Sequence, residues 1–261
     1  MFTRSSRFSS KCLTALLPAW LLVCTAGAAV VFSDDFAAGN LRSAGSLPDF
    51  WTVLQPPDNL ESGATKKDGR LHLVAANHAF TSVALASPRT ETFGFFARPL
   101  TVTLDDILLG FKNLPENEAR FRISLSSART TAELSGSVIT LRVRSGLLLM
   151  GYRVDGYKLS SPPETLSGQG VNSVVVMPLK GVPSKISLTL GPGARDGVVR
   201  YEITVVDHGV RAENDGVIPL AIAQWGGADA AALIVDARRD SASAAPDSFA
   251  ELSVGRITVT R

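Results

Sequence analysis

The amino-acid sequence predicts an all-β protein folded as a two-sheet antiparallel sandwich, and three observations support this fold class. Apolar and polar residues alternate in short runs, which is the period of a strand with one buried face. Gly, Pro, Asn and Asp separate these runs, as they do in chains of many short strands. No stretch after residue 29 carries the period of an amphipathic helix. About a dozen short strands with regular turns fit two packed sheets.

The first 28 residues are expected to form a secretory signal peptide that is removed from the mature protein. Basic residues between Arg4 and Lys11 precede an apolar stretch from Leu13 to Val23, and the small residues Thr25 to Ala29 follow it. This order is typical of a signal peptide, and cleavage after Ala28 satisfies its small-residue rule. Charged and turn-forming residues begin at Ser33, so the apolar segment is too short to span a bilayer.

Residues 29–261 are then expected to form a single domain that is secreted or periplasmic. Apolar residues make up 45% of the chain and charged residues 19%, which suits a globular domain with a substantial core. Both cysteines, Cys12 and Cys24, leave with the signal peptide, so this domain has no disulfide. Three of the 26 basic residues leave as well, and the 24 acidic residues then slightly outnumber the remainder. Bulk charge therefore gives no reason to expect nucleic acid as a partner.

The clearest strands lie between Val138 and Leu159, where Ser145-Gly146 and Asp155-Gly156 are both two-residue hairpin signals. Residues that pair outward from a hairpin turn share one face of the sheet. The two turns place the same apolar residues on the same face, which supports the pairing. The expected pairs are Val143 with Leu148, Leu141 with Met150, Ile139 with Tyr152, Val154 with Tyr157, and Tyr152 with Leu159.

The remaining strands follow from the same alternation along the chain. It is clearest in Arg120–Leu125, Lys185–Leu190 and Arg200–Val206, whose apolar residues are expected to face the core. The Ser- and Ala-rich segment Ser241–Ser248 is expected to be a loop before the last strand. Shorter strands are expected at Val30–Phe36, Phe50–Leu54, Arg70–Ala75, Phe80–Leu85, Leu100–Leu104, Val174–Met177, Ala232–Asp236 and Arg256–Thr260.

Three segments resemble a known family. They are Asp34-Asp35-Phe36 followed by Trp51, the sequence DGRLHL at Asp68–Leu73, and the closing sequence VGRITV at Val254–Val259. Together with the central hairpins they resemble the concanavalin A-like jelly-roll domains of lectins, glucanases and laminin G-like proteins, over essentially all of residues 29–261. The resemblance implies a two-sheet jelly-roll sandwich and a protein that binds or cleaves polysaccharides. A fold of this kind hosts many functions.

Catalytic signatures are weak in this sequence. The laminarinase-type glucanases of the resembling family carry two glutamates as Glu, aliphatic, Asp, any, any, Glu, and this pattern does not occur. Glu116 and Glu118 are close together, but they lie in a turn where solvated charge is ordinary. The chain has no Gly-x-Ser-x-Gly elbow, and His72, His78 and His208 lack metal-ligand spacing. The sequence therefore favours a protein that is not an enzyme, although separate strands could still supply two facing carboxyl groups.

No cofactor is expected from the sequence. Calcium at Asp34-Asp35 or between Asp236 and Asp240 is an open alternative, because jelly rolls of the resembling family often hold this ion and carboxylates are its preferred ligands. Exposed acidic residues in turns are the simpler interpretation of the same segments.

The candidate ligand-binding residues are five arginines and one tryptophan. Arg120, Arg122, Arg142, Arg144 and Arg153 are expected to share the sheet face that is turned away from the core, provided that their strands are neighbours. Guanidinium groups suit carboxylate and sulfate groups, so an acidic glycan fits this face. The alternative is that these arginines solvate an exposed surface and pair with acids such as Glu202.

Aromatic rings that could stack on sugars are scarce in residues 29–261. Trp51 lies in a strand beside Phe50 and Val53 and is expected to pack in the core. Trp225 lies in the Gly-flanked sequence AQWGGAD, where a ring can project from a loop for stacking. The alternative for Trp225 is that its ring covers one end of the sandwich.

The sequence thus predicts a secreted or periplasmic, non-catalytic, lectin-like protein that binds an extracellular or cell-envelope polysaccharide. An acidic polysaccharide is the ligand that the arginines favour. Two alternatives stay open: a glycan-cleaving hydrolase whose acids come from separate strands, and a structural envelope or adhesion protein without a small ligand. A flat sheet with a large apolar patch would favour the structural protein.

Overall fold

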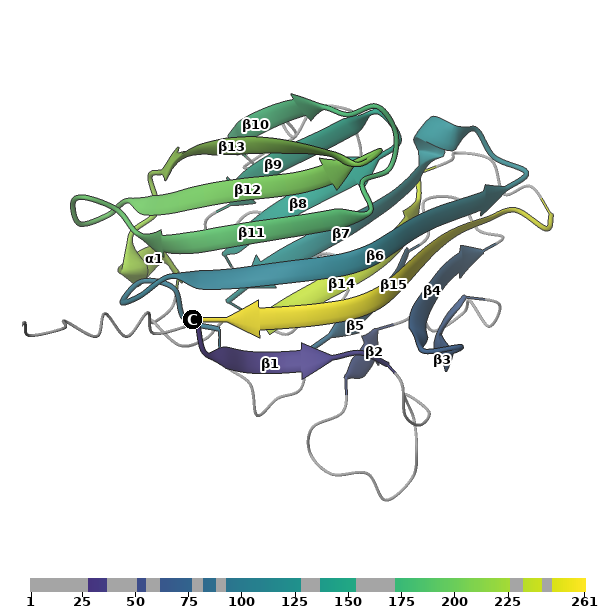
Figure 1. Cartoon of the computed structure of the whole chain (residues 1–261), viewed down its shortest axis with the longest axis horizontal. Helices are drawn as coiled ribbons and strands as arrows, with labels where there is room; N and C mark the ends of the chain where they lie inside the picture. Colours follow the sequence, from purple (N-terminus) through teal and green to yellow (C-terminus); the bar gives the residue numbers. More distant parts are fainter. Residues whose placement is uncertain are drawn as a thin grey trace, which may run out of the picture.

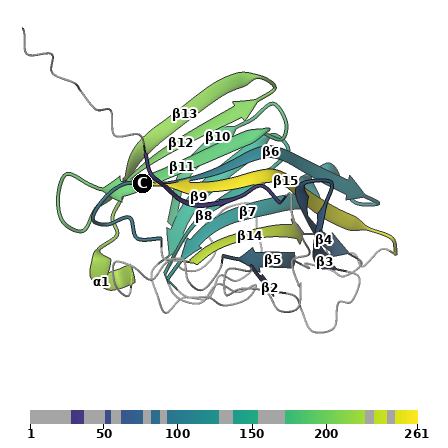
Figure 2. The same ribbon diagram turned by 60° about the horizontal axis from the view of Figure 1, so that its bottom comes forward.

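A computed structural model of the chain describes residues 28–36, 51–54, 62–76, 82–87, 93–127, 137–153, 172–225, 232–240 and 246–261. These residues form two antiparallel sheets, one of eight strands and one of seven, which lie face to face (Figures 1 and 2). The predicted all-β sandwich is confirmed. The expected signal peptide falls on residues that the structure does not describe, apart from its last one.

The eight-stranded sheet has the order β13, β12, β11, β6, β15, β4, β3, and β1 pairs with the other end of β15. Figure 1 shows β1 lying beside the last strand, next to the C-terminus. The backbones of Ala29 and Arg261 exchange two hydrogen bonds, of 2.7 and 2.9 Å. The strands of the eight-stranded sheet are β1 (Val30–Asp34), β3 (Gly63–Lys67), β4 (Arg70–Ala76), β6 (Leu100–Lys112), β11 (Lys185–Pro192), β12 (Val199–Asp207), β13 (Val210–Ile218) and β15 (Phe249–Thr260).

The seven-stranded sheet contains the predicted central hairpin. Ile139, Leu141 and Val143 pair with the residues that the Ser145-Gly146 turn predicted, and Gly146 supplies the positive φ, +78°, that such a turn requires. The second predicted turn, Asp155-Gly156, lies outside the described residues. In order, the strands are β10 (Asn172–Pro178), β9 (Leu147–Arg153), β8 (Val138–Arg144), β7 (Ala119–Ser126), β14 (Ala232–Arg239), β5 (Ser82–Ala86) and β2 (Thr52–Leu54).

The carboxylate of Asp34 connects β1 with Trp51 and with β3 at one end of the core. One carboxylate oxygen accepts the backbone N–H of Phe36 at 2.8 Å, and the other accepts the indole N–H of Trp51 at 2.9 Å. The ammonium group of Lys66, on β3, lies 3.3 Å from the same carboxylate. Trp51 is buried, as predicted. The Asp-Asp-Phe and Trp segments that carried the family resemblance therefore have a structural role.

A double bulge interrupts β6 and β15 at the same place. In β6, Leu104 and Ile107 both face the core, and in β15 so do Val254 and Ile257, although each pair is three residues apart. Asp106 and Gly255, which lie between them, have no partner in the ladder. Asp106 has a φ of +56°. The alternation of inward-facing and outward-facing residues therefore shifts by one residue in both strands. The alternation of apolar and polar residues in the sequence is broken at the same place.

The close approach at this bulge predicts that Gly255→Ala destabilises the fold. A Cβ at residue 255 would lie 2.9 Å from the Cβ and a carboxylate oxygen of Asp106. Overpacking of this kind costs about 1–3 kcal/mol, which urea denaturation can measure. Gly110→Ala is the matched control on the same strand pair, because its Cβ would meet nothing closer than 3.9 Å. Equal stability of the two variants would contradict the prediction.

Candidate functional site

The predicted arginines share the outer face of the seven-stranded sheet, and all but Arg153, which lies beside Val138 at the other end of β8, are close together. Arg122 of β7 is the cross-strand partner of Arg142 on β8 and of Asp236 on β14. Arg120 is the partner of Arg238 on β14, an arginine that sequence reasoning missed because the predicted strand ended at residue 236. We call this surface the arginine face, and its members are Arg120, Arg122, Arg142, Arg144, Arg153 and Arg238.

The expectation that these arginines are open to solvent is wrong for three of them. Arg120 is 5% exposed, Arg122 3% and Arg153 0%. The Nε atom of Arg122 lies 2.8 Å from a carboxylate oxygen of Asp236, and that of Arg120 lies 2.9 Å from Asp240. Arg238 also pairs with Asp240. Buried charges persist when they are paired, so Asp236 and Asp240 hold part of the arginine face inside the protein.

Arg142 and Arg144 form the accessible part of the arginine face. Both are partly exposed, and together with Arg120, Leu147 and Leu149 they surround a narrow gap that is too small to hold a sugar. Burial and the nearby guanidinium groups of Arg122 and Arg238 lower the pKa of Arg142 to about 10. An anion that lies across these side chains would relieve the repulsion between the guanidinium groups.

Trp225 is not available for stacking on a sugar, so the prediction that its ring projects from a loop is wrong. It ends the short helix α1 (Ile222–Trp225), and its side chain is 1% exposed. The ring meets Phe95 edge-on at a centroid distance of 5.0 Å and lies 6.3 Å from that of Phe96. The alternative is a ring that covers one end of the sandwich, and the structure agrees with it in that Trp225 is buried in the core cluster. The local sequence around Trp225 could not predict its burial, because the Phe95 ring that packs against it lies far away in the sequence.

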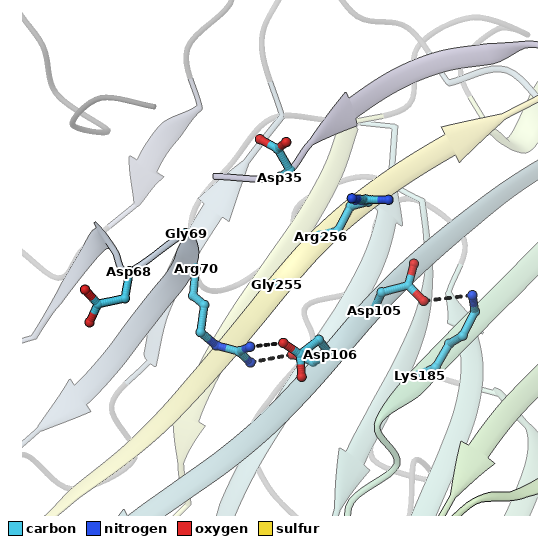
Figure 3. A pocket seen from close by; sticks show the side chains of 9 residues that line it. All are labelled: Asp35, Asp68, Gly69, Arg70, Asp105, Asp106, Lys185, Gly255 and Arg256. Carbon is cyan, nitrogen blue, oxygen red and sulfur yellow. Dashed lines mark hydrogen bonds and ion pairs between the residues drawn. The ribbon is translucent and has the colours of Figure 1, made fainter. Parts of the chain in front are cut away.

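A second concavity lies on the other sheet, at the double bulge (Figure 3). Its lining carries charges of both signs, and sequence reasoning missed it because the bulge creates it. Arg70 reaches across to Asp106, and the ammonium group of Lys185 lies 2.7 Å from Asp105 (Figure 3). These pairs neutralise much of its charge. Its lining residues are Asp35, Asp68, Gly69, Arg70, Asp105, Asp106, Lys185, Gly255 and Arg256.

The acidic residues considered as calcium ligands are engaged by protein donors. Asp34 binds Trp51 and Lys66, and Asp236 binds Arg122. Among the residues that the structure describes, no three His, Cys, Asp or Glu side chains gather as a metal site. His72 points away from the core on β4 and contacts Glu251, with 2.6 Å between Nδ1 and Oε1. Calcium binding therefore stays an untested alternative without a described ligand cluster.

Comparisons with known proteins support the fold rather than an activity. No protein-family profile matches the chain, and no curated protein matches it in sequence. The structure is similar to an endo-1,3-β-glucanase from Streptomyces sioyaensis, with a TM-score of 0.56 and 13% identity over 90% of this chain and 96% of the glucanase. The fold is a concanavalin A-like jelly-roll sandwich.

Two further structures share this concanavalin A-like fold. One belongs to endo-acting O-glycanases of human gut microbiota that initiate mucin breakdown, with a TM-score of 0.51 and 12% identity over 89% of this chain and 99% of that one. The other is the CBM2 module of the evolved Dit protein of Lactobacillus casei BL23 phage J-1, with a TM-score of 0.50 and 8% identity over 89% and 95%. No helix in the described ranges is long and apolar enough to cross a membrane.

Proposed function

We propose that this protein is a secreted or periplasmic, non-catalytic carbohydrate-binding protein, and that its ligand is an anionic polysaccharide held at Arg142 and Arg144. The observation that carries the proposal is the cluster of arginines on the arginine face. Among the described residues, Asp236 and Asp240 form ion pairs with Arg120, Arg122 and Arg238, and burial together with the nearby guanidinium groups lowers the pKa of Arg142. The glucanase, the O-glycanases and the carbohydrate-binding module with the same fold support a glycan as the ligand class.

The exposed surface at Arg142 and Arg144 offers two kinds of contact that suit an acidic sugar. Arg142 and Arg144 lie two residues apart on β8, so they project from the same face roughly 7 Å apart. A polymer with repeated carboxylate or sulfate groups can engage both guanidinium groups at once. Leu147 is paired with Arg144 and is partly exposed, so it provides apolar surface for the C–H groups of a sugar ring.

The arrangement of carboxylates favours binding over cleavage. A retaining glycosidase uses two carboxyl groups roughly 5 Å apart, one of which must donate a proton. The carboxylates that meet the arginine face in the described part of the chain, Asp236 and Asp240, are both held by arginines. Cleavage of the ligand is nevertheless a measurable outcome of the test below.

Arg142→Gln/Arg144→Gln is expected to lower the affinity for an anionic polysaccharide by about tenfold or more, because it removes both accessible guanidinium groups. Calorimetric titration of residues 29–261 with a polyuronate, a sulfated polysaccharide and a neutral glucan measures this change. Wild-type affinity should fall as salt rises from about 50 to about 500 mM, since salt screens exposed charges. The melting temperature of the variant should fall by only about 2–4 °C, so the protein stays folded in the titration.

The control is Arg200→Gln/Arg256→Gln, which removes two exposed arginines from the other sheet and should leave affinity intact. Full affinity in the Arg142/Arg144 variant, or salt-independent binding of the neutral glucan, contradicts the proposed site. Release of new reducing ends from any polysaccharide identifies the protein as a glycan-cleaving enzyme instead. Absence of binding to all three probes favours the structural alternative.

A further inference from the structure

The edge strand β13 presents a long and regular backbone to solvent. All nine of its residues pair with β12, from Val210 opposite Asp207 to Ile218 opposite Val199, without a shift in register. In an antiparallel pair, alternate residues direct their N–H and C=O groups away from the partner strand. No other described strand pairs with the far side of β13, and Figure 2 shows it as the outermost strand of its layer.

The other sheet edges are protected against pairing with a second chain by short length, lysine, proline or a bulge, and β13 has none of these four features. Charged side chains also protect an edge, and those of β13 are Arg211, Glu213 and Asp215. The strand β3, at the other end of the same sheet, has five residues and ends in Lys66 and Lys67. In the second sheet, β10 has a bulge after Ser173 and ends in Pro178, while β2 has three residues. β13 contains no lysine, no proline and no bulge.

The charges of β13 are complementary to those of a second copy in one particular register. Arg211 and Glu213 are both exposed and lie on the same face of the strand, where they contact each other. A two-fold axis at Ala212 places Arg211 of each copy opposite Glu213 of the other, which gives two ion pairs. An axis at Glu213 would place Arg211 opposite Asp215 but would also oppose Glu213 to itself, and an axis at Asn214 would oppose Glu213 to Asp215. Like charges directly opposite one another destabilise a sheet.

We propose that two copies of this chain associate through β13, antiparallel about a two-fold axis at Ala212, so that residues 210–214 of the two strands pair and their eight-stranded sheets become one continuous sheet. The interface is isologous, since each copy contributes the same residues. Backbone hydrogen bonds supply affinity, as in strand addition to a sheet edge, and the Arg211–Glu213 pairs fix the register. The arginine face belongs to the other sheet, so the dimer interface does not cover it. The proposed dimer therefore does not depend on the proposed glycan binding.

Light scattering coupled to size-exclusion chromatography of residues 29–261 tests the proposal. The wild type is expected to have the mass of a dimer. Arg211→Glu and Glu213→Arg should each shift it to a monomer, because every variant copy then opposes two like charges. The combined variant Arg211→Glu/Glu213→Arg should restore the dimer, since the pairs re-form with their signs exchanged. Arg200→Glu, which changes an exposed residue on the neighbouring strand β12, should not alter the mass.

Three outcomes would overturn the inference. The first is a wild type that stays monomeric at about 100 μM, a concentration at which a micromolar interface is filled. The second is dimerisation of both single variants, which would place the interface elsewhere. The third is a combined variant that remains monomeric although its melting temperature matches the wild type, which would exclude the register about Ala212.

Discussion

Asp236→Ala is expected to lower the free energy of unfolding by about 3–5 kcal/mol, because it leaves the buried guanidinium of Arg122 without its partner. The Arg122 Nε atom lies 2.8 and 3.0 Å from the two oxygens of Asp236, and both residues are buried. Urea denaturation of residues 29–261, followed by tryptophan fluorescence, measures the loss. This stability measurement does not depend on whether the protein binds an anionic glycan.

The double variant Arg122→Met/Asp236→Leu separates the loss of a partner from the loss of the pair. Replacing both charges by apolar side chains removes the unpaired charge, so this variant should be more stable than Asp236→Ala. A double variant that is less stable than Asp236→Ala would show that the ion pair itself stabilises the fold. A cost below about 1 kcal/mol for Asp236→Ala would contradict the burial of this pair.

Leu141→Asp is expected to destabilise the protein by about 4 kcal/mol or more, because a carboxylate would replace a fully buried side chain in the core. Its neighbour Arg142 projects from the opposite face of β8, and Arg142→Gln should cost about 0.5–1 kcal/mol. Thermal unfolding followed by circular dichroism compares the two. If Arg142→Gln melted at a lower temperature than Leu141→Asp, the core-facing register of the central hairpin would be wrong.

Local sequence signals were sufficient for the central hairpin and insufficient at the bulge. The Ser145-Gly146 turn fixes both strands around it, so Leu141 and Met150 could be paired from sequence alone. In β6 and β15 the alternation changes phase at Asp106 and Gly255, and the expected strands stopped there. β13 was not predicted because its Asn-Asp-Gly sequence is typical of a turn. Pairing with β12 holds these residues in a strand.

The sequence could place the arginines on one face but could not predict how deeply they are buried. Alternation along β7 and β8 decides the face of Arg122 and Arg142. Burial depends on Asp236, which is 114 residues from Arg122 in the chain. Trp225 illustrates the same limit, because the aromatic side chains that enclose it come from a distant segment. Periodicity records the direction of a side chain, whereas its environment is set by tertiary contacts.

The pairing of β1 with β15 has a consequence for how the chain folds. Ser33 and Thr258 meet across this pair although 225 residues separate them, so the eight-stranded sheet has a high contact order. Bringing β1 and β15 together costs conformational entropy before the contacts between them can form and offset it. β15 also pairs with both β4 and β6, so the middle of the sheet cannot form without it. Folding is therefore expected to be slow.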